Sequence, residues 1–99
     1  MRIFAIRARV HASAVADVET AARRIFTGLE RDRPDGFRFV AGRLADGVTY
    51  LILVHVEEGA ANPLDTLPEY QQFLRGLKDW RDGRSEEGPM ELVGSYRLF

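Results

Sequence analysis

The sequence predicts a single α+β domain of the ferredoxin-like type over residues 1–99, with two helices on one face of a four-stranded antiparallel sheet. Three observations carry this prediction. The stretch TYLILVHV at 49–56 is short, rich in β-branched residues and apolar on both faces, as expected of a central strand covered from both sides. Two segments, 15–29 and 67–80, repeat apolar residues at helical spacing. Alternating patterns typical of strands occupy segments 3–11, 37–44 and 90–99.

The first strand and the first helix follow from simple periodicities. Residues 3–11 alternate, so that one face of the strand carries the apolar side chains of Phe4, Ile6, Ala8 and Val10. The helix that follows has acidic residues early and arginines late, which is the arrangement that the helix dipole favours. Pro34 and Gly36 then end the helix and lead into the second strand.

The second half of the chain continues this pattern after a hairpin. An Ala-Asp-Gly sequence separates the second strand from the third, which predicts that these two strands are antiparallel. Thr66 and Glu69 have the spacing of a capping box, and the proline between them is tolerated in the first turn of a helix. The helix runs to about Trp80, and a charged loop connects it to the last strand.

The element order βαββαβ with right-handed crossovers predicts the strand order 4-1-3-2. We expect the first and third strands to be parallel neighbours at the centre of this sheet, with both helices covering one face. The opposite face also carries apolar side chains, namely those of Val40, Leu51, Leu53, Val93 and Phe99. Because a monomer would leave these side chains uncovered, the sequence predicts a homodimer in which two sheets pack face to face, with the helices outside.

The composition limits the classes of function. A formal net charge of −1 gives no general attraction to nucleic acid or to anionic lipid, so we predict neither partner. The sequence has no cysteine, which removes disulfides, thiolate catalysis and cysteine-ligated metals. The residues after Met1 alternate instead of forming the apolar core of a signal peptide, so we expect a cytoplasmic protein.

Three stretches carry a family resemblance: the two-faced strand LILVHV, the second helix PEYQQFLRGLKDW and the closing strand MELVGSYRLF. Together with the element order, they make the whole chain similar to the dimeric α+β barrel superfamily, and within it to the antibiotic biosynthesis monooxygenase (ABM) branch. This resemblance implies a homodimer with a ligand cleft between helices and sheet in each subunit. Some members of the family oxidise polycyclic aromatic substrates with O₂ and no cofactor, whereas others degrade haem or have no known activity.

The sequence departs from this family at two places. Members with demonstrated chemistry tend to carry an asparagine on the first strand and a histidine on the second helix, and neither residue is present in IFAIRARV or PEYQQFLRGLKDW. Haem degradation is therefore disfavoured, because this helix has no histidine to ligate iron. Two functions stay open. The first is a homodimer that binds a small aromatic or apolar metabolite as a cofactor-free monooxygenase, and the second is a non-catalytic ligand-binding or structural dimer of the same fold.

Three aromatic residues are candidates for the ligand cleft that the resemblance implies. Tyr70 and Trp80 of the second helix would position an aromatic ring, and Tyr96 of the last strand would donate a hydrogen bond to an oxyanion. The alternative is that aromatic residues at helical spacing belong to the hydrophobic core. No cofactor is predicted for this cleft.

A second candidate site lies on the face of the sheet away from the helices. With the first and third strands parallel, His11 and His55 would lie near one end of the sheet, and a plausible register brings Glu91 across from His11. Two imidazoles and a carboxylate suit a divalent metal or a proton relay. The alternative is a pair of solvated histidines at the end of a sheet, and we predict no bound metal.

Overall fold

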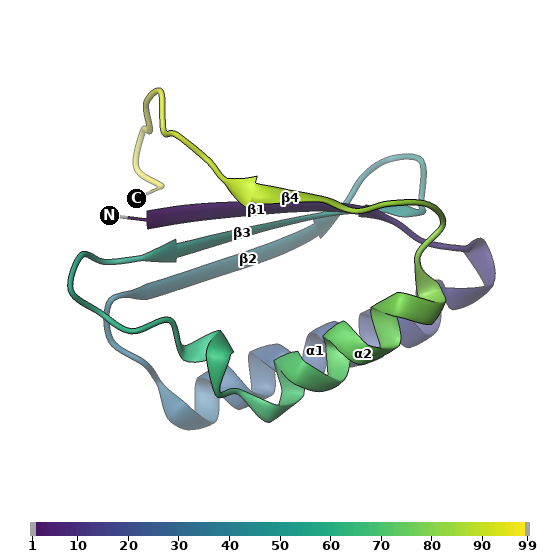
Figure 1. Ribbon diagram of the computed structural model, residues 1–99, viewed down its shortest axis with the longest axis horizontal. Helices are drawn as coiled ribbons and strands as arrows, with labels where there is room; N and C mark the ends of the chain where they lie inside the picture. The colour runs from purple at the N-terminus through teal and green to yellow at the C-terminus, as the bar shows by residue number, and fades with distance from the viewer. Residues whose placement is uncertain (1, 99) are drawn as a thin grey trace.

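The computed structural model of the protein describes residues 2–98, and its elements follow the predicted order βαββαβ (Figure 1). The strands are β1 (Arg2–Arg9), β2 (Phe37–Arg43), β3 (Thr49–Val56) and β4 (Glu86–Pro89). The helices are α1 (Val15–Asp32) and α2 (Pro68–Trp80), each preceded by a short 3₁₀ turn at Ala12–Ala14 and Pro63–Asp65.

The four strands form one antiparallel sheet in the order β2-β3-β1-β4, which is the predicted order read from the other edge. The prediction that β1 and β3 are parallel is wrong. They are antiparallel, with Arg2 opposite Val56 and Arg9 opposite Thr49. The reason is the hairpin between β2 and β3. Because the crossover through α1 makes β1 and β2 parallel, the strand inserted between them runs against both.

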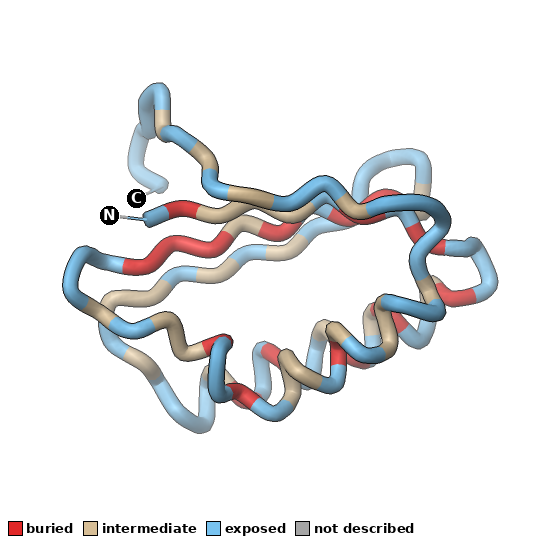
Figure 2. The backbone as a smooth tube through the Cα atoms, viewed as in Figure 1, coloured by how far each residue is buried: buried red, intermediate tan, exposed pale blue. Residues whose placement is uncertain are grey.

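Both helices pack against one face of the sheet, and the hydrophobic core lies between the two layers (Figures 1 and 2). Val56 of β3 is fully buried there, and Val18 and Ile25 of α1 face it from the helix layer at 1% exposure each. The predicted inward faces of β1 and β3 are confirmed. The inward side chains are buried or packed against the core at Phe4, Ile6, Ala8, Val10, Tyr50, Ile52, Val54 and Val56.

The opposite face of the sheet keeps apolar side chains in solvent, as predicted. Val40 is 50% exposed and Leu51 is 41% exposed, while Leu53 is partly covered. The chain after β4 turns to this side of the sheet and ends near the start of β1 (Figure 1). There the guanidinium of Arg38 donates a hydrogen bond to the carbonyl of Leu98 at 3.2 Å.

The last strand does not occupy the predicted segment. Strand β4 comes earlier, in the segment predicted as a charged loop, and pairs Glu86 to Pro89 with Arg7 to Phe4. The amide of Met90 still donates to the carbonyl of Ile3 at 2.8 Å, but β1 starts at Arg2, so the following residues have no strand left to pair with. The alternating segment 90–98 therefore lies outside the sheet, with Val93 fully exposed. Phe99 lies outside the described residues.

The start of α2 also differs from its prediction. The N-cap residue is Leu67, and no side chain caps the helix there, so the capping box of Thr66 and Glu69 is absent. The polar cap lies one turn earlier, where the side chain of Asn62 accepts a hydrogen bond from the amide of Leu64 at 3.0 Å. Glu69 instead binds Arg31 of α1 at 2.8 Å, which ties the two helices together. Across residues 2–98, no helix is both long enough and apolar enough to cross a membrane.

Candidate functional site

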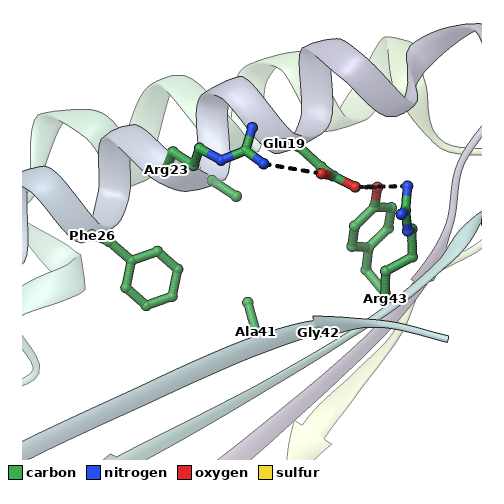
Figure 3. Close-up of a pocket in the computed structure, with 8 residues that line it drawn as sticks. Glu19, Arg23, Phe26, Ala41, Gly42 and Arg43 are labelled. Atoms are coloured by element: carbon green, nitrogen blue, oxygen red, sulfur yellow. Dashed lines mark hydrogen bonds and ion pairs between the residues drawn. The ribbon is translucent and has the colours of Figure 1, made fainter.

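A cavity of about 340 Å³ opens between α1 and the edge strand β2, on the helix side of the sheet (Figure 3). Small side chains create the space, because Ala22 on α1 faces Ala41 and Gly42 on β2. The cavity has a polar end and an aromatic end, and Figure 3 shows Arg43 and Phe26 on opposite sides of it. The full lining is Glu19, Ala22, Arg23, Phe26, Ala41, Gly42, Arg43 and Tyr50.

The polar end is organised by the carboxylate of Glu19. The Oη of Tyr50 donates a hydrogen bond to Oε2 of Glu19 at 2.9 Å, and the guanidinium of Arg43 lies 2.9 Å from the same oxygen. Arg23, one helical turn after Glu19, reaches the other carboxylate oxygen at 3.4 Å. One carboxylate is thus shared by two guanidinium groups and a phenol. The cluster carries a net charge of +1, because the two arginines outnumber the single glutamate.

Tyr50 joins this cluster to the hydrophobic core. Its ring packs among apolar side chains at the centre of the sheet and is only 8% exposed. A buried phenol needs a hydrogen-bond partner, and Glu19 supplies one from the helix layer above it. Burial and this hydrogen bond raise the pKa of Tyr50 above its ordinary value, so the phenol stays protonated and remains a donor at neutral pH.

The aromatic end of the cavity is formed by Phe26 of α1. Its side chain is 38% exposed, although it is a large apolar residue. Its ring contacts Phe39 of β2 edge-on, with ring centroids 5.3 Å apart. The cavity therefore offers an aromatic wall at one end and hydrogen-bonding groups of net positive charge at the other. This combination suits a flat apolar molecule that carries an acidic oxygen.

Comparisons with known proteins give no match at the level of sequence, because no protein-family model and no curated protein matches the chain. The similarity is structural. SnoaB, a cofactor-independent oxygenase from Streptomyces nogalater, matches with a TM-score of 0.69 and 23% identity, over 97% of this chain and 96% of SnoaB. Rv0793 from Mycobacterium tuberculosis matches with a TM-score of 0.71 and 14% identity, over 96% and 98% of the two chains.

A further crystal structure, described as an antibiotic biosynthesis monooxygenase, matches with a TM-score of 0.69 and 11% identity, over 95% of this chain and all of that one. The chain has the fold of the antibiotic biosynthesis monooxygenases. The ABM resemblance predicted from the sequence is thus confirmed as a likeness of fold over nearly the whole length.

The three aromatic residues predicted for the ligand cleft are not brought together in this ABM fold. Tyr70 and Trp80 lie on α2 on either side of Phe73, with ring centroids 6.5 and 6.4 Å from the Phe73 ring. Both pack against the core, which was the alternative interpretation. Tyr96 is 83% exposed in the segment after β4, where the guanidinium of Arg97 lies 5.2 Å from its ring centroid. None of the three lines the cavity between α1 and β2.

The cluster of His11, His55 and Glu91 does not form, because β1 and β3 are antiparallel. His55 lies opposite Ile3, at the end of the sheet where β1 begins, and is buried at 6% exposure. His11 follows the other end of β1, and its amide donates to the carbonyl of Trp80 at 2.9 Å. Glu91 is exposed and follows β4 at the His55 end. Within the described residues 2–98, no three His, Cys, Asp or Glu side chains are grouped closely enough to hold a metal ion.

The residues of the cavity were not singled out from the sequence, although one signal for them is present. Tyr50 lies on the inward face of a strand among aliphatic residues, and its hydroxyl requires a polar partner in that layer. An acidic residue on the first helix is the natural partner, and Glu19 supplies it in the structure. The space beside the cluster depends on the small side chains Ala22, Ala41 and Gly42 facing one another, which requires the packing of α1 on β2.

Proposed function

We propose that this protein binds a small aromatic metabolite that carries an acidic oxygen, in the cavity between α1 and β2. The observation that carries the proposal is the arrangement of the cavity, with the Phe26 ring at one end and the Tyr50–Glu19–Arg43 cluster at the other. The volume of about 340 Å³ lies at the lower end of the range for small-molecule sites, about 300–1,000 Å³. The acidic oxygen would accept hydrogen bonds from Arg43 and Arg23, and its negative charge would neutralise the net charge of +1 on the cluster of these two residues and Glu19.

The reaction that we propose for the bound molecule is a cofactor-free monooxygenation. SnoaB, which shares this fold, is a cofactor-independent oxygenase. In such a reaction an electron-rich phenolate or enolate reduces O₂ directly. One oxygen atom enters the substrate as a carbonyl, and the other leaves as water with the two hydrogens of the oxidised carbon. The chain would hold the substrate oxygen anionic through the guanidinium groups of Arg43 and Arg23, which line the polar end of the cavity.

The test is a pair of measurements on the same samples. Titration of the protein with anthrones and hydroquinones, followed by amide NMR, should shift the resonances of Glu19, Arg43 and Tyr50. Oxygen uptake without added metal or flavin should then accompany binding. Arg43→Gln should weaken binding of the anionic ligand by about tenfold or more, because a charge-assisted hydrogen bond contributes about 1.5–3 kcal/mol. Arg24→Gln is the matched control, because Arg24 is exposed on α1 and does not line the cavity.

A non-catalytic ligand-binding dimer is the second candidate, and two observations favour it. The carboxylate of Glu19 is already engaged by two arginines and a phenol, so the polar end is occupied by hydrogen bonds before any substrate enters. In addition, the space beneath the helices at Phe73 and Leu77 has room for only about 10 Å³, which leaves no interior chamber there. NMR shifts at the cavity without oxygen uptake would support this candidate over the oxygenase.

We also propose that the protein is a homodimer through the outer face of the sheet. The exposed apolar side chains Val40 and Leu51 lie on this face and have no cover within the described part of the chain. Sedimentation at micromolar concentration should give about twice the chain mass of 11.2 kDa. Leu51→Arg should yield monomer, whereas Gln72→Arg, an exposed position on α2, should leave the mass unchanged. A wild-type monomer would contradict the proposal.

A further inference from the structure

We infer that the seam between α1 and β2 is one elongated binding groove for an aromatic carboxylate, and that Phe26 sets the length of the molecule it accepts. This inference rests on the proposed function, because it concerns ligands held at the Tyr50–Glu19–Arg43 cluster. It assigns a specificity-determining role to a residue that stands between two hollows of the same seam.

The second hollow, of about 500 Å³, continues the seam beyond the first cavity. Its lining comes from the end of α1, the turn after it and the start of β2, and consists of Phe26, Leu29, Glu30, Arg33, Pro34, Phe37 and Phe39. The first cavity is lined by the earlier part of α1 and the later part of β2. Since the two elements are common to both linings, the hollows follow one another along the seam. Phe26 is the residue that belongs to both linings.

The ring of Phe26 separates the two hollows without being locked in the core. It contacts Phe39 edge-on at 5.3 Å, and Phe39 stacks on Phe37 with centroids 6.2 Å apart. The three rings thus form a row from the first cavity into the second hollow. At 38% exposure, the Phe26 side chain faces solvent more than a core phenylalanine does, so its replacement changes the groove more than the core. A shorter side chain there would connect the two hollows.

This arrangement defines a class of ligand. The carboxylate would pair with Arg43 and Arg23, and the first ring would lie between Ala22 and Ala41 in the first cavity. A second ring placed in line with the first meets Phe26 in the wild type. The row of phenylalanine rings would hold that second ring once the partition is removed, because aromatic rings gain from edge-to-face and offset contacts.

The test compares benzoate, which has one ring, with biphenyl-4-carboxylate, which has two rings in line. Dissociation constants for both are measured by NMR titration of the full chain. In Phe26→Ala the ratio of the two affinities should move toward biphenyl-4-carboxylate by about tenfold relative to wild type, as expected when a steric block in an apolar pocket is removed. Phe37→Ala is the control, because Phe37 lines only the second hollow and should leave the ratio within about twofold of wild type.

The outcomes distinguish the role of Phe26 from the proposed function. Benzoate shifts at Glu19 and Arg43 with an unchanged ratio in Phe26→Ala would overturn the role of Phe26 and leave the proposed function standing. Failure of both probes to bind wild type would overturn the proposed function, and the groove with it. Should Phe26→Ala fail to fold, Phe26→Leu should move the ratio in the same direction and Phe26→Trp in the opposite one, and an unchanged ratio in both would refute the inference.

Discussion

Replacing Tyr50 by phenylalanine isolates one hydrogen bond at the centre of the candidate site. The substitution keeps the ring in the core and removes only the hydroxyl, which donates to Glu19 across the sheet–helix boundary at 2.9 Å. Because phenylalanine keeps the whole ring, which is 8% exposed in the wild type, no apolar contact of the ring is lost. Any change in the free energy of unfolding therefore reports the hydrogen bond itself.

The expected loss follows from what remains around Glu19. A hydrogen bond to a charged acceptor contributes about 1.5–3 kcal/mol. Glu19 keeps Arg43 at 2.9 Å, and its side chain is 27% exposed, so water replaces part of the lost interaction. We therefore expect Tyr50→Phe to lower the free energy of unfolding by about 1–1.5 kcal/mol and Tm by about 5–10 °C. Tyr96→Phe, at 83% exposure, should change stability by less than about 0.5 kcal/mol.

Urea denaturation at one fixed protein concentration measures both variants, since association would make stability depend on concentration. Equal stability of Tyr50→Phe and Tyr96→Phe would refute the reasoning. A second readout is pH. The pKa of Tyr50 is raised in the folded state, so its contribution is complete below the ordinary tyrosine value of about 10 and is lost as pH rises above it. The gap between wild type and Tyr50→Phe should therefore narrow above about pH 10.

Three further predictions concern the scaffold that positions the site. A Cβ added at Gly28 would lie 2.5 Å from a carboxylate oxygen of Glu69, so Gly28→Ala in the wild type must displace Glu69 from Arg31. In a Glu69→Ala background, Gly28→Ala should instead stabilise the fold by about 0.8 kcal/mol through helix propensity. Chemical denaturation of the wild type, the two single variants and the double variant measures the effect of Gly28→Ala on the free energy of unfolding in each background. Asp46→Asn should destabilise the hairpin at neutral pH. Hydrogen bonds from the Thr49 hydroxyl and from the amides of Val48 and Thr49 hold the pKa of Asp46 below its usual range, so its contribution is lost as pH falls through the lowered pKa. Thermal melts from pH 7 to pH 2 should show the wild type approaching the variant, and parallel curves would contradict this. Val56→Ala should cost about 2 kcal/mol, because the side chain is fully buried, and a loss below about 0.5 kcal/mol would place Val56 outside the core.

The fold was predictable because it depends on periodicities that are local in the sequence. The two-faced pattern of 49–56 identified a central strand, and the alternation in β1 identified its inward face. The direction of β1 relative to β3 does not follow from local patterns, because it is set by how the hairpin inserts β3 between two parallel strands. The last strand was misplaced for a related reason: the pattern of 90–99 is that of a strand, but pairing stops where β1 begins.

The candidate site was less predictable than the fold, because cavities arise from the fit between elements. Tyr70 and Trp80 have the residue types of a ligand cleft, yet packing around Phe73 places them against the core. The cavity instead depends on Ala22, an ordinary helix residue, which becomes informative only when α1 is placed over β2. His11 and His55 lie at opposite ends of the sheet because β1 and β3 are antiparallel, whereas the sequence predicted them to be parallel.

The pairing of β1 has a consequence for how the chain is made. This strand leaves the ribosome before β3 and β4, yet its two edges pair with these later strands. At about 5–20 residues per second, the nascent chain carries β1 for several seconds before the residues opposite it exist. Both edges of β1 are open to wrong pairing until β3 emerges, and the edge that pairs with β4 stays open for longer. Translation speed and chaperone binding before β4 emerges should therefore affect the yield of native protein.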